Sequence, residues 1–265
     1  MILALEDVSF GYGDEPDLLA NFNLRIAKGE FVAFLGPSGS GKSTLLNLVA
    51  GLLEPRSGHI RFNRQQLQGI NRDVGYMTQG DTLLPWLTVA KNVLLPLELR
   101  GIPRSERQQR LARALDLVGL TDALHKHPSE LSGGMRRRAL LARSLIYGPP
   151  MLLMDEPFAA LDAQLRETMH QELLSTVNRL DESVMFVTHD IAESVLLADR
   201  VVVLSHRPLC ILEDVAIPFG KDRNLDELRP SPEYRLLEAH VREVLRQGTK
   251  ARGPIGADTP RASIQ

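Results

Sequence analysis

A glycine-rich loop directly behind a short apolar run is the feature that most constrains how this chain can fold. The run FVAFL (31–35) is continuously apolar, as a buried central strand is expected to be. The loop GPSGSGKST (36–44) leads into a helical pattern from Lys42 to Ala50, which Gly51 stops. A strand, a glycine-rich turn and a helix in this order match the phosphate-binding pattern G-x-x-x-x-G-K-S/T.

The chemistry of this loop predicts that it binds the phosphates of a nucleotide. Successive backbone N–H groups and a helix N-terminus attract an anion, and glycines let a phosphate approach the backbone. We expect Lys42 to reach the β- and γ-phosphates and Ser43 to offer its hydroxyl to Mg²⁺. A glycine-rich turn that binds nothing is the alternative, but such a turn has no use for Gly-Lys-Ser at this point. The predicted binding residues of the loop are Gly36, Pro37, Ser38, Gly39, Ser40, Gly41, Lys42, Ser43 and Thr44.

An acidic pair ends a second apolar run, LLMDE (152–156). We expect Asp155 to hold Mg²⁺ through water and Glu156 to polarise the water that attacks the γ-phosphate. A solvated acidic pair at the end of a strand is the alternative reading. The phosphate loop upstream favours the metal and catalytic roles, because bound phosphates need both partners.

Strand and helix patterns alternate around these two motifs, which predicts parallel strands with crossover helices. The middle of the chain is helical instead, with Ser105 expected to cap one of its helices. The predicted strands are 2–10, 23–27, 31–35, 59–62, 74–77, 151–155, 183–189 and 200–205, and the predicted helices are 42–50, 105–120, 134–147, 163–180, 191–199 and 231–248. The predicted divisions are a core at 1–85, a helical subdomain at 86–148, the second part of the core at 149–248 and a disordered tail at 249–265.

Composition limits the classes of protein that this chain of 265 residues can represent. Its net charge of −2 and mixed charges argue against general attraction to nucleic acid. A single cysteine, Cys210, excludes an internal disulfide framework and suits a reducing compartment. The N-terminus carries acids where a secretory signal carries bases. No apolar run approaches the roughly 18 residues that span a bilayer, so work at a membrane would need another protein to hold the chain there.

Five further motifs complete a pattern that resembles the ATP-binding subunits of ABC transporters. They are Tyr12, Gln79, LSGG within ELSGGMRRR (130–138), AALDA (159–163) and THD (188–190). The resemblance covers about residues 1–215, and LSGG between a phosphate loop and an acidic strand end is highly specific. It implies an α/β fold: a P-loop NTPase core with an N-terminal antiparallel β subdomain and an inserted helical subdomain.

The resemblance also implies a role for each motif. Tyr12 is similar to the aromatic residue that stacks on adenine, although a core or surface tyrosine is the alternative. Gln79 resembles the residue that senses Mg²⁺ and the attacking water and that starts a flexible link to the helical subdomain. His189 resembles the histidine that contacts the γ-phosphate, with an ordinary core histidine as the alternative. The implied residues at the seam with a second copy are Ser132, Gly133, Gly134 and Asp162.

The LSGG signature implies a dimer, because the family pairs two chains head to tail and buries two ATP molecules between them. The signature of one chain then contacts the γ-phosphate held by the other. Since LSGG opens a helix, its N–H groups and dipole can face an anion. We therefore expect ATP binding to close the dimer and hydrolysis to open it.

The segment GDTLLPWLTVAKNV (80–93) points to a further partner. In the family this region forms a groove for a short cytoplasmic helix of the membrane permease. We expect Leu83, Leu84, Pro85 and Trp86 to be exposed, with Trp86 as an aromatic anchor unless it simply packs the helical subdomain.

Three stretches, the LLPW run, EPFAALDAQLR (156–166) and 188–205, resemble the importer ATPases for nitrate, sulfonate, taurine and related ions. This implies a peripheral protein on the cytoplasmic face of the inner or plasma membrane, served indirectly by a periplasmic or extracellular solute-binding protein. The alternatives are an ABC ATPase of lipoprotein release or cell division and a soluble ABC ATPase. A soluble form is disfavoured because the chain has no zinc-type cysteines, no long coiled coil and no second ATPase module.

Two residues depart from the family pattern. Thr78 stands where an aromatic residue is frequent, and Arg137 stands where glutamine is usual after the signature. We expect both residues to lie outside the phosphate chemistry. The basic run Arg136-Arg137-Arg138 suggests either nucleic-acid binding or a solvated helix face, and the balanced net charge favours the solvated face.

Overall fold

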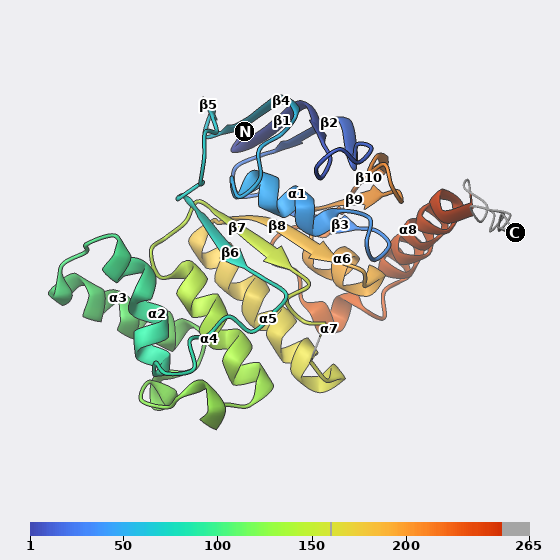
Figure 1. Ribbon diagram of the computed structural model, residues 1–265. Coiled ribbons are helices and arrows are strands. Elements are labelled where there is room, and N and C mark those ends of the chain that lie inside the picture. The colour runs from blue at the N-terminus through green and yellow to red at the C-terminus, as the bar shows by residue number, and fades with distance from the viewer. Residues whose placement is uncertain (160, 251–265) are drawn as a thin grey trace, which may run out of the picture.

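The computed structural model describes residues 1–159 and 161–250 and contains two β-sheets with helices around them (Figure 1). The larger sheet has six strands. In spatial order they are β10 (Ile211–Ala216), β9 (Arg200–Leu204), β3 (Phe31–Leu35), β8 (Ser183–Thr188), β7 (Met151–Asp155) and β6 (Val74–Met77). All neighbours in this sheet are parallel except β10, which is antiparallel to β9.

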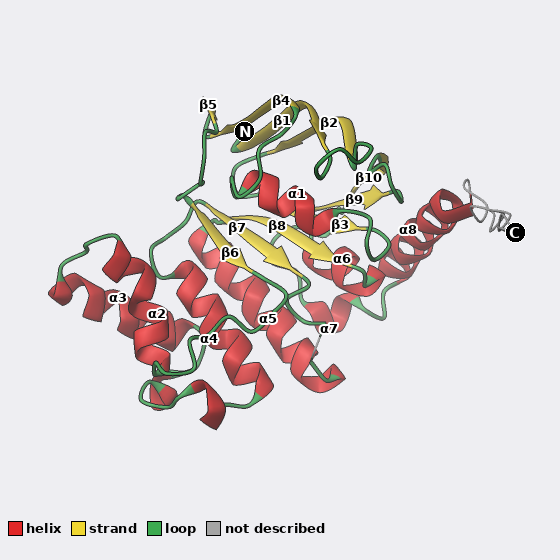
Figure 2. Cartoon of the chain, in the orientation of Figure 1, coloured by secondary structure: helices red, strands yellow, loops and turns green. Residues whose placement is uncertain are grey.

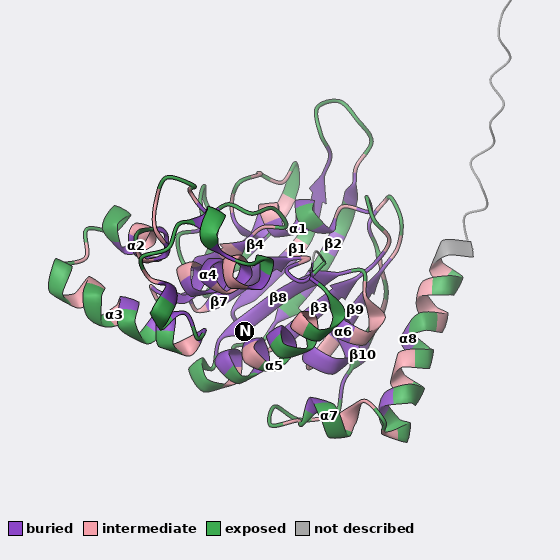
Figure 3. Cartoon of the chain, turned by 90° about the horizontal axis from the view of Figure 1, so that it is seen from below, coloured by how far each residue is buried: buried purple, intermediate pink, exposed green. Residues whose placement is uncertain are grey.

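The central strand β3 shows why the large sheet needs apolar residues on both faces. Phe31, Ala33 and Leu35 belong to one hydrophobic core. Val32 and Phe34 belong to the other, on the opposite face of the sheet. Alternate side chains of a strand point to opposite faces, so a strand covered on both sides is continuously apolar. Figure 3 shows the strands of this sheet as the most buried part of the molecule.

The smaller sheet is antiparallel and lies over the first helix. Its spatial order is β2 (Leu19–Ile26), β1 (Leu3–Phe10), β4 (Ser57–Phe62) and β5 (Gln65–Gln66). Helix α1 (Lys42–Val49) packs between the two sheets, and its leucines share one core with both (Figures 1 and 2). The phosphate loop is therefore supported by β3 on one side and by the buried α1 on the other.

The remaining helices cover the other face of the large sheet and extend beyond its β6 edge. Helices α2, α3 and α4 gather at that edge, and α5, α6 and α8 cover the sheet (Figure 1). Their bounds are α2 (Val89–Leu99), α3 (Arg104–Leu117), α4 (Gly133–Leu145), α5 (Ala163–Leu180), α6 (Ile191–Leu197), α7 (Leu225–Leu228) and α8 (Pro232–Lys250), with short 3₁₀ turns at Thr121–Ala123 and Pro128–Glu130. None of the helices in residues 1–159 and 161–250 combines the length and the hydrophobicity that a membrane-spanning segment needs.

The predicted α/β fold with an antiparallel sheet is confirmed, and the structure corrects two local expectations. Ser105 does not cap its helix, because α3 begins one residue earlier and its N-cap is Pro103, which makes no side-chain cap bond. Strand β10 was not predicted, since its residues are half exposed and three of them are acidic or small. Of the predicted tail, residues 251–265 lie outside the described part of the chain.

A buried carboxyl group gives the fold a predictable dependence on pH. Glu182 follows α5 and is 8% exposed, and burial together with the charge of Asp181 raises its pKa from the ordinary 4.5 to about 7. The folded chain then binds this proton more tightly than the unfolded chain. Its contribution to stability is complete below about pH 4.5 and is lost as the pH rises through about 7.

We therefore expect the unfolding free energy of the wild type to fall between pH 5 and pH 8, and we expect Glu182→Gln to lack this fall. The shift in pKa corresponds to roughly 1–3 kcal/mol of unfolding free energy. Urea unfolding of both proteins at the two pH values measures this difference directly. The exposed Glu15→Gln serves as the control and should retain the wild-type dependence. An equal loss of stability in wild type and Glu182→Gln would contradict the prediction.

Candidate functional site

The phosphate loop is shaped so that its backbone amides are available to an anion. Gly39 and Gly41 have φ of +74° and +113°, a region that favours glycine. Within the described residues, the N–H groups of Ser38, Gly39, Gly41, Lys42 and Ser43 donate to no protein acceptor, whereas Ser40 N–H donates to Pro37 O. A run of unpaired amides before a helix is suited to a polyphosphate. This geometry fits the predicted binding of a nucleotide.

Lys42 is held inside the loop by the loop's own carbonyl groups. Its Nζ donates to Gly36 O and to Pro37 O, each at 2.8 Å. The side chain is 4% exposed. Burial lowers the pKa of Lys42, and the nearby charges of Glu156 and Asp155 oppose that shift. The ammonium group is therefore positioned over the loop, where it can meet phosphate oxygens.

Asp155 and Ser43 lie together at the end of β7. Asp155 is 7% exposed. Burial raises the pKa of Asp155, while a hydrogen bond from Ser43 and the charge of Lys42 lower it and the charge of Glu156 raises it further. Ser43 itself is exposed. One hydroxyl oxygen and one carboxylate, adjacent and partly open, form the kind of oxygen ligand set that Mg²⁺ uses beside phosphates.

Glu156 is the point where three predicted catalytic residues meet. His189 Nδ1 lies 3.1 Å from Glu156 Oε2, and Gln79 Nε2 donates to the same oxygen at 3.3 Å. These side chains come from the ends of β8, β7 and β6, which are neighbouring parallel strands. Glu156 has a φ of +45°, unusual for a residue with a side chain. The strained backbone directs its carboxylate away from the strand and toward Gln79 and His189.

Tyr12 lies beside the start of α1 and is 44% exposed. Its hydroxyl forms a hydrogen bond of 2.9 Å with Thr44 Oγ1, and its ring meets Phe10 edge to face. The structure thus excludes a core position for Tyr12. A partly exposed aromatic ring next to the phosphate loop is available for stacking on a base.

The signature residues lie apart from the phosphate loop of the same chain. Ser132 caps α4 by accepting a hydrogen bond from Met135 N, and Asp162 caps α5 by accepting from Leu165 N. Ser132, Gly133 and Asp162 are exposed. Among the described residues, no hydrogen bond or ion pair joins them to the phosphate loop or to Glu156.

Gly134 links the starts of α4 and α5. A Cβ at Gly134 would lie 2.5 Å from the side chain of Leu165, which is too close for any larger residue without rearrangement. The close approach packs the signature helix against the helix that Asp162 caps. The two predicted seam elements are therefore mechanically connected within one chain.

The segment after Gln79 is exposed in part only. Trp86 is 70% exposed and Pro85 is also exposed, which argues against simple packing of the tryptophan. Leu83 corrects the prediction, because it is 7% exposed and belongs to the core shared with α2 and α4. Leu84 is half-buried, and its N–H donates to Asn92 Oδ1.

The basic run of α4 is not the solvated face that the sequence suggested. Arg137 is 8% exposed and donates to Thr78 O and Gln79 O. Arg138 donates to Val118 O and Gly119 O. Arg136 also bonds within the chain, to Leu131 O and to Asp81. Backbone carbonyls of loops that are distant in sequence accept hydrogen bonds from Arg137 and Arg138, and no periodicity in α4 could reveal that.

Sequence reasoning also missed Arg207, whose Nε donates to Gly39 O at 3.2 Å. This contact brings a second cation to the phosphate loop. The two residues are separated by 168 positions, so no local motif pointed to the contact.

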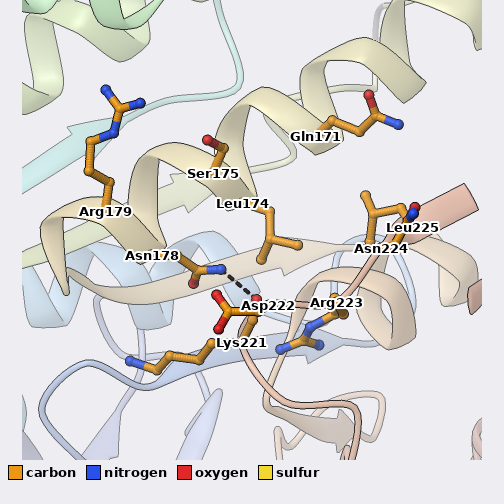
Figure 4. A pocket seen from close by; sticks show the side chains of 10 residues that line it. All are labelled: Gln171, Leu174, Ser175, Asn178, Arg179, Lys221, Asp222, Arg223, Asn224 and Leu225. Carbon is orange, nitrogen blue, oxygen red and sulfur yellow. Dashed lines mark hydrogen bonds between the residues drawn. The ribbon is translucent and has the colours of Figure 1, made fainter.

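A pocket elsewhere on the molecule carries none of the predicted site residues. It has a volume of about 570 Å³ and lies between α5 and the chain before α7 (Figure 4). Its polar lining is already paired in part, since Asn178 donates to Lys221 O and Lys221 forms an ion pair with Asp181. The phosphate loop remains the candidate site, because the amides, the lysine and the carboxylates converge there.

Comparison with known proteins identifies the family of the chain. The sequence profile of the ABC transporter family matches residues 19–159. A nitrate import ATP-binding protein from Synechocystis sp. is 43% identical over 233 residues, covering 86% of this chain and 88% of that protein. A taurine import ATP-binding protein from Pseudomonas putida is 42% identical over 221 residues, covering 83% of this chain and 84% of that protein.

A solved structure gives the same result at the level of fold. It is a dimeric ATP-binding cassette in a post-hydrolysis state bound to ADP and Pi, with a TM-score of 0.71 and 31% identity over 82% of this chain and 99% of that chain. The chain belongs to the ABC transporter family. The prediction of an ATP-binding subunit with hydrolytic activity is thereby confirmed.

Proposed function

We propose that this chain binds and hydrolyses ATP to energise the import of a small anion or organosulfur or nitrogen compound, of the nitrate, sulfonate or taurine kind, through a separate permease. The observation that carries the proposal is the convergence of Gln79 and His189 on Glu156, beside a phosphate loop with unpaired amides. The names of the relatives favour an importer over lipoprotein release, cell division or a soluble ATPase.

Some residues of the site bind the nucleotide, and others act on the water that attacks the γ-phosphate. The loop amides and Lys42 bind the phosphates, and Tyr12 stacks on the base. Glu156 accepts a proton from the attacking water, because its carboxylate is the acceptor on which the site converges. Gln79 orients that water, and His189 contacts the γ-phosphate from the neighbouring strand end.

We assign the metal to Ser43, Asp155 and, through the attacking water, Gln79. The hydrogen bond between Ser43 and Asp155 supports this assignment, because it places two hard oxygen ligands together. When bound there, Mg²⁺ supplies positive charge to the β- and γ-phosphate oxygens. The described residues contain no group of three or more histidine, cysteine and acidic side chains that could form a separate metal cage.

In this proposal, each bound ATP is contacted by two copies of this chain: the copy whose phosphate loop binds it, and a second copy. Ser132, Gly133 and Gly134 would bind the γ-phosphate held by that copy, and Asp162 would line the seam. Ser132, Gly133 and Asp162 are exposed and stand at helix starts, which supports a role in contacts between copies. The solved relative is itself dimeric and bound to ADP and Pi.

Transport requires a permease, and we place its docking site at the helical part of the chain, about residues 86–148. Exposed Trp86 supports this placement, since a large aromatic side chain in the open is typical of an interface anchor. The chain would then sit at the cytoplasmic face of the membrane. A solute-binding protein outside would deliver the cargo to the permease and would not touch this chain.

The experiment that tests this function is recovery of the tagged chain from detergent-solubilised native membranes, followed by identification of its partners. We expect a polytopic permease and an associated solute-binding protein that binds nitrate, a sulfonate or taurine. A ribosomal, DNA-repair or cell-division partner would overturn the importer proposal while leaving the ATP chemistry intact.

Trp86→Ala separates docking from nucleotide binding. Because Trp86 is 70% exposed, we expect its removal to leave the affinity for ATP unchanged and to weaken recovery of the permease about tenfold or more. Nucleotide titration and the same membrane recovery measure the two effects. Leu236→Ala is the control, since Leu236 is also exposed, at 72%, and lies on α8, outside the proposed docking region. Equal losses of ATP binding and permease recovery would contradict a docking role.

A further inference from the structure

Three arginines on one helix hold the segment that leads away from β6. Arg137 Nη2 donates to Gln79 O at 2.5 Å, and its Nη1 donates to Thr78 O at 3.4 Å. Arg143 donates to Thr82 O at 2.8 Å and to Thr82 Oγ1 at 2.6 Å. We call Arg136, Arg137 and Arg143 the arginine clamp.

Arg136 completes the clamp through an ion pair of 3.0 Å with Asp81. The contacts of the clamp fall on four residues of the segment 78–82 and come from arginines that span about two turns of α4. Arg137 lies deepest, at 8% exposed, and the other two lie closer to the surface. The helix that begins with the signature is thus bonded directly to the backbone around Gln79.

Gln79 is consequently held at two points. Its backbone carbonyl accepts from Arg137, and its side-chain Nε2 donates to Glu156 Oε2 at 3.3 Å. The first contact belongs to α4 and the second to the end of β7. A shift of α4 relative to the large sheet must therefore move the carboxamide of Gln79 relative to the carboxylate of Glu156.

The contact of Arg137 is also costly to break. Burial lowers the pKa of Arg137, and the charge of Asp81 opposes that shift. A guanidinium remains charged in proteins, and a buried charge without its hydrogen-bond partners is strongly unfavourable. Charge-assisted hydrogen bonds from such a group are stronger than neutral ones. The segment should follow the helix rather than separate from it.

We propose that Arg137 is a positioning residue for Gln79: by holding the backbone carbonyl of Gln79, it fixes where the carboxamide of Gln79 lies against Glu156. The inference rests on the role proposed above for Gln79. It assigns a function to the one residue of the signature region where this chain carries arginine and the resembled family usually carries glutamine.

The test is Arg137→Met, which keeps the apolar stem and removes the donors. We expect kcat for ATP hydrolysis to fall about tenfold, the scale for loss of one positioning hydrogen bond, with KM for ATP changed less than about threefold. Trp86 is the only tryptophan in the chain, and it follows the clamped segment by four residues. Its fluorescence anisotropy should fall in Arg137→Met, because Thr78 and Gln79 lose their hydrogen bonds to α4 and the segment keeps only the contacts of Arg136 and Arg143.

Two companion variants separate positioning from general destabilisation. Arg138→Met removes the neighbouring arginine of the same helix, which bonds to Val118 and Gly119 instead of the clamped segment. It should leave kcat and the Trp86 signal at wild-type values. Arg137→Gln retains an N–H donor and should restore much of kcat. Wild-type kcat and anisotropy in Arg137→Met, or equal losses in Arg138→Met, would overturn the inference.

Gln79→Ala, measured in parallel, distinguishes this inference from the proposed function. If Gln79→Ala lowers kcat and Arg137→Met does not, the clamp fails as a positioning device and the role of Gln79 stands. If Gln79→Ala retains wild-type kcat, the role proposed for Gln79 is wrong, and the inference about Arg137 falls with it.

Discussion

Glu156→Gln is expected to abolish ATP hydrolysis and to leave the protein as a stable dimer in the presence of ATP and Mg²⁺. Glutamine has the shape of glutamate but cannot accept the proton of the attacking water, so the rate should fall at least about 100-fold. In the wild type, Gln79 Nε2 and His189 Nδ1 both contact Glu156 Oε2. The side-chain amide of a glutamine at position 156 can still form hydrogen bonds at this place. Binding should therefore survive while turnover does not.

The trapped dimer follows from the separation between the signature and the phosphate loop. Within one chain Ser132 and Gly133 are exposed and make no bond to that loop, so a second copy can present them to the γ-phosphate. If hydrolysis is what removes that contact, its loss keeps the two copies together. Size-exclusion chromatography with light scattering measures the association, and release of phosphate measures the turnover.

Two conditions make this result specific to the triphosphate. With ADP in place of ATP, Glu156→Gln should remain monomeric, because the signature has no γ-phosphate to bind. The double variant Lys42→Ala/Glu156→Gln should also remain monomeric, because it lacks the lysine that the phosphate loop contributes. A monomer of Glu156→Gln at saturating ATP and Mg²⁺ would contradict the head-to-tail arrangement.

The parts of the fold that the sequence predicted are those whose signal is local. FVAFL is apolar throughout because β3 is covered by a core on each face, and the loop behind it has glycines where φ is positive. The acidic pair and THD end neighbouring parallel strands, so their side chains had to come close. Element type and order followed from patterns of a few residues.

The parts that could not be predicted depend on contacts between distant residues. Arg137 donates to a carbonyl 58 positions away, and nothing in the run Arg136-Arg137-Arg138 distinguishes a buried guanidinium from a solvated one. Leu83 is buried in the core to which residues of α2 and α4 also belong, although its neighbours in the LLPW run are more exposed. Strand β10 is an edge strand with one exposed face. Its sequence therefore mixes polar and apolar residues and lacks the apolar pattern that predicts a strand.

Lys42→Ala is expected to cost most of the affinity for ATP. Lys42 is 4% exposed, and its ammonium group already lies over the loop, held by the carbonyls of Gly36 and Pro37. Its hydrogen bonds to phosphate oxygens would be charge-assisted, and two such bonds correspond to roughly 100-fold in the dissociation constant. Alanine removes the charge and also leaves the two loop carbonyls without their donor.

Calorimetric titration with a non-hydrolysable ATP analogue measures this loss, and the shift of the melting temperature on adding ATP gives an independent readout, since a ligand stabilises only the state that binds it. Lys42→Met tests the same charge while filling the buried space better than alanine. Lys91→Ala, which removes an exposed lysine on α2, should bind like the wild type. Wild-type affinity in both Lys42 variants would mean that the amides of the loop suffice, and that the buried lysine serves only to tie its carbonyls together.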